Sequence, residues 1–194
     1  MPRSIFSIGG MASSGITIEA AYINPEKVKQ VQKLLETMPE IEMRAYNKGC
    51  TNFGRMLARY IKRCIMTNTP PPGVSWPAHS EDYLKNYDPK GFWYLSGQML
   101  RSISVFQRSN GRYYVGPPPD EMAIAPVNRK GRSHPSKLTL VQLARIQELG
   151  SYTVHNDIPP RPLFIPSFKA VGGAARLQKY IVANLRREIK KVIT

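Results

Sequence analysis

Apolar residues recur at three- and four-residue spacing between residues 40 and 67, and this pattern predicts the longest helix of the chain. The other side of that helix carries six basic side chains, and no acidic residue occurs between Glu42 and Glu81. A solvated helix usually mixes both signs of charge, so a one-signed face favours a partner, although a solvated basic face explains any single residue at least as well. The basic positions are Arg44, Lys48, Arg55, Arg59, Lys62 and Arg63.

Four further helices follow from start and stop signals. Asn24 and Pro25 suit the cap and first position of a helix that should stop near Pro39. Ser80 is a candidate cap for a short helix, and Thr139 and Gly150 bound a helix over 139–150. Residues 173–193 predict a final amphipathic helix whose apolar face consists of Leu177, Tyr180, Ile181, Leu185, Ile189 and Val192.

Strand signals are fewer. Residues 16–23 alternate, and the strand-like segments 100–107 and 112–115 flank Asn110-Gly111, a strong hairpin signal. The expected fold class is α+β, with a small, mostly antiparallel sheet of about four strands packed against two long helices, and with long loops. Residues 1–14 are expected to be a mobile N-terminal arm, and residues 15–194 a single domain.

The net charge of the chain indicates the kind of partner that it could bind. The chain of 194 residues has 28 basic and 13 acidic residues, a net charge of +15, which favours contact with a polyanion or with an acidic protein surface. No apolar run is long enough for a membrane span, and the N-terminus lacks a signal-peptide core, so a soluble intracellular protein is the better interpretation.

Catalytic and metal-binding patterns are not recognisable. Cys50 and Cys64 would lie ~21 Å apart on one helix, which excludes a disulfide between them. The three histidines have no metal-ligand spacing, Ser96 lacks a nucleophile-elbow motif, and no phosphate loop follows the paired glycines at 172–173. We therefore expect a binding or structural protein with no catalytic residue, cofactor or metal.

The segment from residue 155 to 168, HNDIPPRPLFIPSF, combines four prolines with apolar residues. Following Gly150, it predicts a rigid extended strap at a sheet edge that leads to the last helix. Ile158, Phe164 and Phe168 are expected to face the core. For Arg161 we favour hydrogen bonding to nearby carbonyls over a subunit contact.

Three segments stand in order within about residues 70–168: GVSWPAHSEDYLKNY, LSGQMLRSISV, and LTLVQLARIQELG followed by IPPRPLFIPSF. Together they resemble the Mu-type phage virion-morphogenesis (tail-completion) family. Leu149 departs from the family, where an aromatic residue is common, and Leu163-Phe164 shifts or replaces the phenylalanine after the arginine–proline pair. The positions that carry the resemblance are Trp76, Pro77, Gly97, Leu100, Arg101, Ser102, Ile103, Glu148, Gly150, Ile158, Pro159, Arg161 and Pro162, with Phe164.

The resemblance implies a non-enzymatic virion protein of the head–tail neck, assembled in the host cytoplasm. Such proteins form cyclic oligomers, for which we expect a hexamer, around the channel through which DNA leaves the head. The implied partners are further copies of the chain and neighbouring neck, portal-adaptor or tail-terminator proteins, with non-specific DNA contact in the channel and no membrane.

Two questions stay open at this point. A basic nucleic-acid-binding module without catalytic activity is the alternative function. The loop 128–137 could face DNA or an acidic partner ring, and we favour an acidic partner for at least half of the excess charge. The candidate partner- or DNA-facing residues are Arg129, Lys130, Arg132 and Lys137 in this loop, and Arg55, Arg59 and Lys62 on the long helix.

Overall fold

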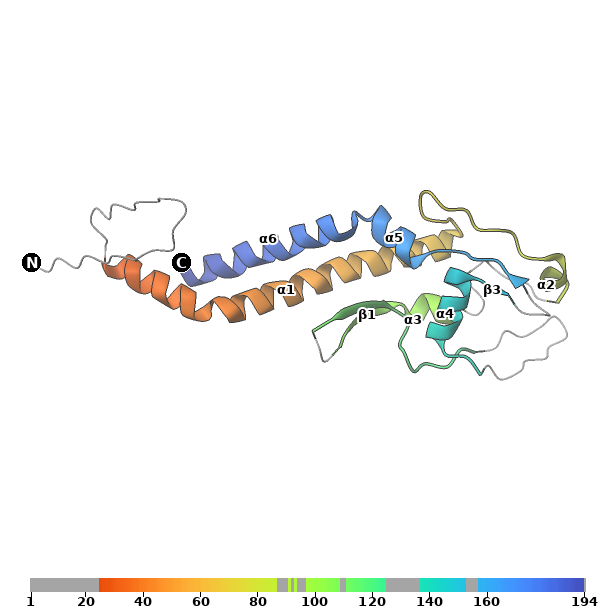
Figure 1. The fold of residues 1–194 in the computed structure, drawn as a ribbon, viewed down its shortest axis with the longest axis horizontal. Coiled ribbons are helices and arrows are strands. Elements are labelled where there is room, and N and C mark those ends of the chain that lie inside the picture. The colour runs from red at the N-terminus through yellow and green to blue at the C-terminus, as the bar shows by residue number, and fades with distance from the viewer. Residues whose placement is uncertain are drawn as a thin grey trace, which may run out of the picture.

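Two helices of very different length form the frame of the molecule. The computed structural model describes residues 25–86, 91, 93, 97–108, 111–124, 137–152 and 157–193. Helix α1 (Pro25–Thr67) and helix α6 (Gly173–Ile193) lie side by side and antiparallel, and the smaller elements gather around the C-terminal half of α1 (Figure 1). The fold is α+β, as expected.

The prediction that the first helix stops near Pro39 is wrong, because α1 runs through this residue. Proline removes one backbone donor and crowds the preceding turn, so a helix bends at it and continues where the following turns are held by packing. The ribbon of α1 changes direction in its N-terminal third (Figure 1). Beyond the bend, Ile41 and Ala45 are buried, which holds the continuing helix in place.

The predicted hairpin is present and its first strand is shorter than expected. Strands β1 (Ser104–Gln107) and β2 (Tyr113–Gly116) pair antiparallel. Residues 98–102 form the short helix α3 (Gln98–Ser102), so the expected strand over 100–107 is wrong in its first part. The Ser102 hydroxyl donates to the Met99 carbonyl at 3.0 Å, a local bond that competes with strand pairing. Asn110 lies outside the described residues.

A second strand pair lies near the proline-rich segment. Strands β3 (Ser151–Tyr152) and β4 (Asp157–Ile158) pair antiparallel and share no strand with the hairpin. Within the described residues there are thus two two-stranded sheets instead of one sheet of about four strands. The strand expected over 16–23 and the arm over 1–14 lie outside the described residues.

The apolar faces of the long helices meet each other, which corrects the expectation that both cover one face of a sheet. A Cβ added to Gly49 of α1 would lie 2.7 to 2.9 Å from three atoms of Ile181 of α6, so the helices approach closely at this glycine. A second face of α1 contacts the hairpin, where an added Cβ on Gly54 would lie 2.9 Å from Val105. Helix α1 therefore separates α6 from the hairpin.

Two of the connecting helices begin where the sequence predicts, and α4 also ends there. In α4 (Leu140–Leu149), the Thr139 hydroxyl accepts from the Gln142 amide at 3.2 Å, and the Gln142 side chain accepts from the Thr139 amide at 2.8 Å. Gly150 ends this helix with φ 78°. In α2 (Glu81–Asn86), the Tyr83 amide donates to the Ser80 hydroxyl at 3.3 Å.

Candidate functional site

Several residues of the resemblance meet around the proline-rich segment. The Arg161 side chain is only 3% exposed, and its Nε and Nη2 donate to the carbonyls of Pro77 and Ala78 at 3.1 and 3.2 Å. In the opposite direction, the Trp76 indole N–H donates a hydrogen bond to the Pro162 carbonyl at 2.9 Å. Two loops more than eighty residues apart in sequence are thereby joined by three hydrogen bonds.

Glu148 joins the same segment to α4. Its carboxylate accepts from the backbone amides of Leu163, Phe164 and Ile165 at 2.6, 3.0 and 3.3 Å. These amides lie at the N-terminus of helix α5 (Phe164–Ala170), where the helix itself offers them no acceptor. The carboxylate satisfies them and lies at the positive end of the helix dipole. The strap is therefore extended only as far as Leu163, and the expectation of an extended strap over 164–168 is wrong.

We call Trp76, Pro77, Glu148, Arg161 and Pro162 the strap cluster. Burial lowers the pKa of the Arg161 guanidinium, and burial followed by the charge of Arg161 lowers the pKa of His79. A lowered pKa keeps His79 neutral at pH 7, where its ring stacks on Tyr83 at 4.8 Å between ring centroids. Arg161 thus makes the carbonyl contacts that the sequence favoured, and the cluster holds backbone segments together.

The remaining residues of the resemblance have different surroundings. Ile103 is buried in the core, Gly97 is buried with φ 71°, and Leu100 packs against the core. Arg101 is exposed, and the structure does not bring it into the strap cluster. Around the strap, Ile158 and Pro159 are half-buried, and the Phe164 ring meets Trp93 edge-on at 5.7 Å.

Gln98 is a buried polar residue that the sequence did not single out. Its side-chain amide donates to the Glu121 carboxylate and to the Met122 carbonyl, both at 2.9 Å. Its carbonyl oxygen accepts from the Ile124 amide at 2.7 Å. Because one glutamine satisfies three groups of the 121–124 segment, it fixes that segment against α3. A glutamine beside Gly97 gives no sequence signal for contacts more than twenty residues away.

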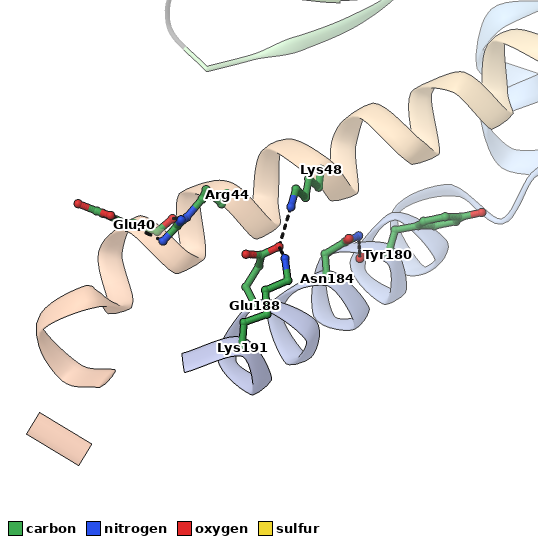
Figure 2. A network of polar contacts seen from close by, with 7 residues as sticks. All are labelled: Glu40, Arg44, Lys48, Tyr180, Asn184, Glu188 and Lys191. Carbon is green, nitrogen blue, oxygen red and sulfur yellow. Dashed lines mark hydrogen bonds and ion pairs between the residues drawn. The ribbon is translucent and has the colours of Figure 1, made fainter. Parts of the chain in front are cut away.

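The seam between α1 and α6 contains a second polar feature that periodicity missed (Figure 2). The Glu188 side chain of α6 is 8% exposed and accepts from Lys48 Nζ of α1 at 2.7 Å and from Lys191 Nζ at 2.9 Å. The two lysines, Lys48 first, hold the pKa of Glu188 well below its ordinary value, at about 2. One turn earlier, the buried Asn184 amide donates to the Tyr180 carbonyl at 2.7 Å. The ion pair favours one register of the two helices.

Four of the basic candidates lie within the described residues, three on α1 and one before α4. Arg55 and Arg59 of α1 are exposed, and Lys62 is half-buried. Lys137 is exposed just before α4. The loop residues Arg129, Lys130 and Arg132 lie outside the described residues, so their predicted partner contacts stay a prediction.

The N-terminal part of α1 carries an apolar stripe on its surface. We define the overhang as residues 25–38, the part of α1 that precedes its buried positions and extends past the end of α6 (Figure 1). Val31 and Leu35 in the overhang are 54% and 64% exposed, and Val28 lies one turn earlier on the same face. These positions share a helix face with Gly49, which lies against Ile181 of α6, so the stripe continues the face of α1 that α6 covers further along.

Metal-ligating side chains do not gather in the part of the chain that the structure describes. No group of three His, Cys, Asp or Glu residues there could hold a metal ion. Cys50 and Cys64 are free thiols, as their spacing predicts, and burial raises the pKa of both. Among the helices described, none is long and apolar enough to cross a membrane.

Comparison with known proteins found no relative of this chain. The chain matches no family model, no curated protein and no solved structure. The functional class proposed below therefore rests on the residues of the chain and their geometry.

Proposed function

We propose that this chain is a structural protein of the phage head–tail neck that assembles with further copies of itself into a ring around the DNA exit channel. Its neighbours in the virion would be portal-adaptor, neck or tail-terminator proteins. The proposal rests on the resemblance over about residues 70–168. The strap cluster supports it, because five resembling residues from three distant segments act together as one structural unit.

The observation that carries the assembly part of the proposal is the exposed apolar stripe of the overhang, against which no other helix or strand of the described residues packs. The overhang spans ~21 Å of helix, and its face continues an interface that is already filled by α6. Exposed apolar surface that continues a packed interface marks a protein contact more often than a solvated face. We assign this surface to a second copy of the chain, since a head-to-tail contact between copies is what closes a ring.

Light scattering after size exclusion, together with negative-stain images, tests the proposal. The chain is measured alone and with the purified portal-adaptor and tail-terminator proteins of its phage. We expect either a ring of the chain alone or a ring that closes on one of these proteins. A chain that stays a monomer and binds neither protein would refute the proposal.

A matched pair of variants tests the role assigned to the overhang. Val31→Asp places a charge within the apolar stripe, and Gln30→Asp places the same charge one residue away on the polar side of the helix. Both residues are exposed, so both variants should fold. We expect Val31→Asp to shift the assembled mass to that of the monomer and Gln30→Asp to leave it unchanged. Equal masses for the two variants would contradict this role.

A further inference from the structure

A row of basic side chains runs along the exposed side of α1. We define the α1 stripe as Arg44, Lys48, Arg55, Arg59 and Lys62, which follow one another at intervals of four, seven, four and three residues. These intervals keep all five side chains on one helix face. At 1.5 Å per residue the stripe covers ~27 Å of the helix.

The second half of the α1 stripe has no neutralising neighbour within the described residues. Arg44 pairs with Glu40 at 3.7 Å, and Lys48 shares Glu188 with another lysine. Arg55, Arg59 and Lys62, by contrast, form no ion pair with any residue that the structure describes. Their positive charge is therefore available to a ligand.

The composition of this face favours a phosphate backbone over an acidic protein. Apart from the basic residues it presents Thr51, Asn52 and, at its end, Met66, so it lacks the apolar centre that a protein interface normally has. Arginine supplies three of the five charges, and its planar fork matches the oxygens of a phosphate group. One strand of duplex DNA places a phosphate every ~3.4 Å along the axis, so the stripe is long enough to follow about eight of them.

We propose that the α1 stripe binds the phosphate backbone of double-stranded DNA without sequence preference. A duplex fits better than a single strand, because no aromatic side chain stands on the stripe to stack on unpaired bases. The contacts are electrostatic, so binding weakens steeply with salt and lets DNA slide at physiological ionic strength. This surface goes beyond the neck assignment and does not depend on it.

Fluorescence anisotropy of the full chain with a labelled 30-bp duplex tests the proposal over a range of salt concentrations. The triple variant Arg55→Gln, Arg59→Gln, Lys62→Gln removes the unpaired half of the stripe. The control, Lys179→Gln, Arg186→Gln, Arg187→Gln, removes the same number of charges from exposed positions of α6. Circular dichroism verifies that both variants keep the helical content of the parent chain.

We expect the stripe variant to lose at least about ten-fold in affinity at 50 mM salt and to reduce the slope of log affinity against log salt by about 0.9 for each lost phosphate contact. The α6 control should retain most of the affinity and slope. Equal losses in both variants would overturn the proposal, because net charge alone would then explain binding.

Two competitors separate the remaining alternatives. Unlabelled duplex should displace the probe at lower concentration than poly-glutamate or a single strand of the same length. Displacement by poly-glutamate as effective as that by duplex would assign the stripe to acidic proteins instead, and no binding of the duplex at 50 mM salt would also refute the proposal. Each binding measurement uses the unassembled chain, so its result does not depend on whether a ring forms.

Discussion

Replacing Arg161 with alanine removes the side chain that joins the proline-rich segment to the loop after Trp76. The guanidinium donates two hydrogen bonds, to the carbonyls of Pro77 and Ala78. A hydrogen bond from a charged donor contributes ~1.5–3 kcal/mol, and the lower end applies here because both acceptor residues are partly accessible to water. The two bonds together give a loss of ~3 kcal/mol in the free energy of unfolding.

Thermal unfolding followed by circular dichroism measures this loss. For a chain of this size ~3 kcal/mol corresponds to a fall of about 6–12 °C in Tm. Arg161→Lys keeps the charge and part of the hydrogen bonding, so its Tm should lie between those of the parent and the alanine variant. The control is Arg145→Ala on the exposed side of α4. If Arg161→Ala lowered Tm no more than this control does, the structural role assigned to Arg161 would be wrong.

Two further predictions concern the seam between α1 and α6. Gly49→Ala should lower the free energy of unfolding by about 1 kcal/mol or more, because the cost of overpacking against Ile181 exceeds the gain in helix propensity. Chemical denaturation measures this free energy, and a variant more stable than the parent chain would contradict the close approach of the two helices. The pKa of Glu188 is lowered from 4.5 to about 2, so its contribution to stability is complete above pH 4.5 and is lost as the pH falls towards 2. In Glu188→Gln the fall of Tm over this pH window should become shallower, and a fall as steep as in the parent chain would contradict this role of Glu188.

Local signals in the sequence predicted α2, α4 and the hairpin, but not α3, α5 or the pair of strands β3 and β4. Thr139 and Gly150 bound α4 because a capping side chain and a glycine with positive φ act within one turn. The hairpin followed from alternation on both sides of an Asn-Gly pair. By contrast, Pro39 looked like a stop signal, and only the packing of the later turns shows why α1 continues through it.

Contacts between distant segments could not be predicted in the same way. The resemblance singled out Glu148, but nothing near it in the sequence shows that its carboxylate accepts a hydrogen bond from the Phe164 amide at the start of α5. Glu188 interrupts an apolar face, and its partner Lys48 lies 140 residues earlier. The sequence indicated the basic face of α1 correctly. Which of its charges stay unpaired depends on where α6 places its one acidic side chain.

The contact between copies at the overhang can be measured most directly by photo-crosslinking. A photoreactive amino acid is placed at position 35 in the apolar stripe or, as the control, at position 30 on the polar side, and the chain is irradiated under conditions in which the assembled mass is observed. We predict crosslinks between two copies from position 35 and none from position 30. Crosslinks from position 35 that stay within one chain, or crosslinks between copies from both positions alike, would contradict the assignment of the overhang to a second copy.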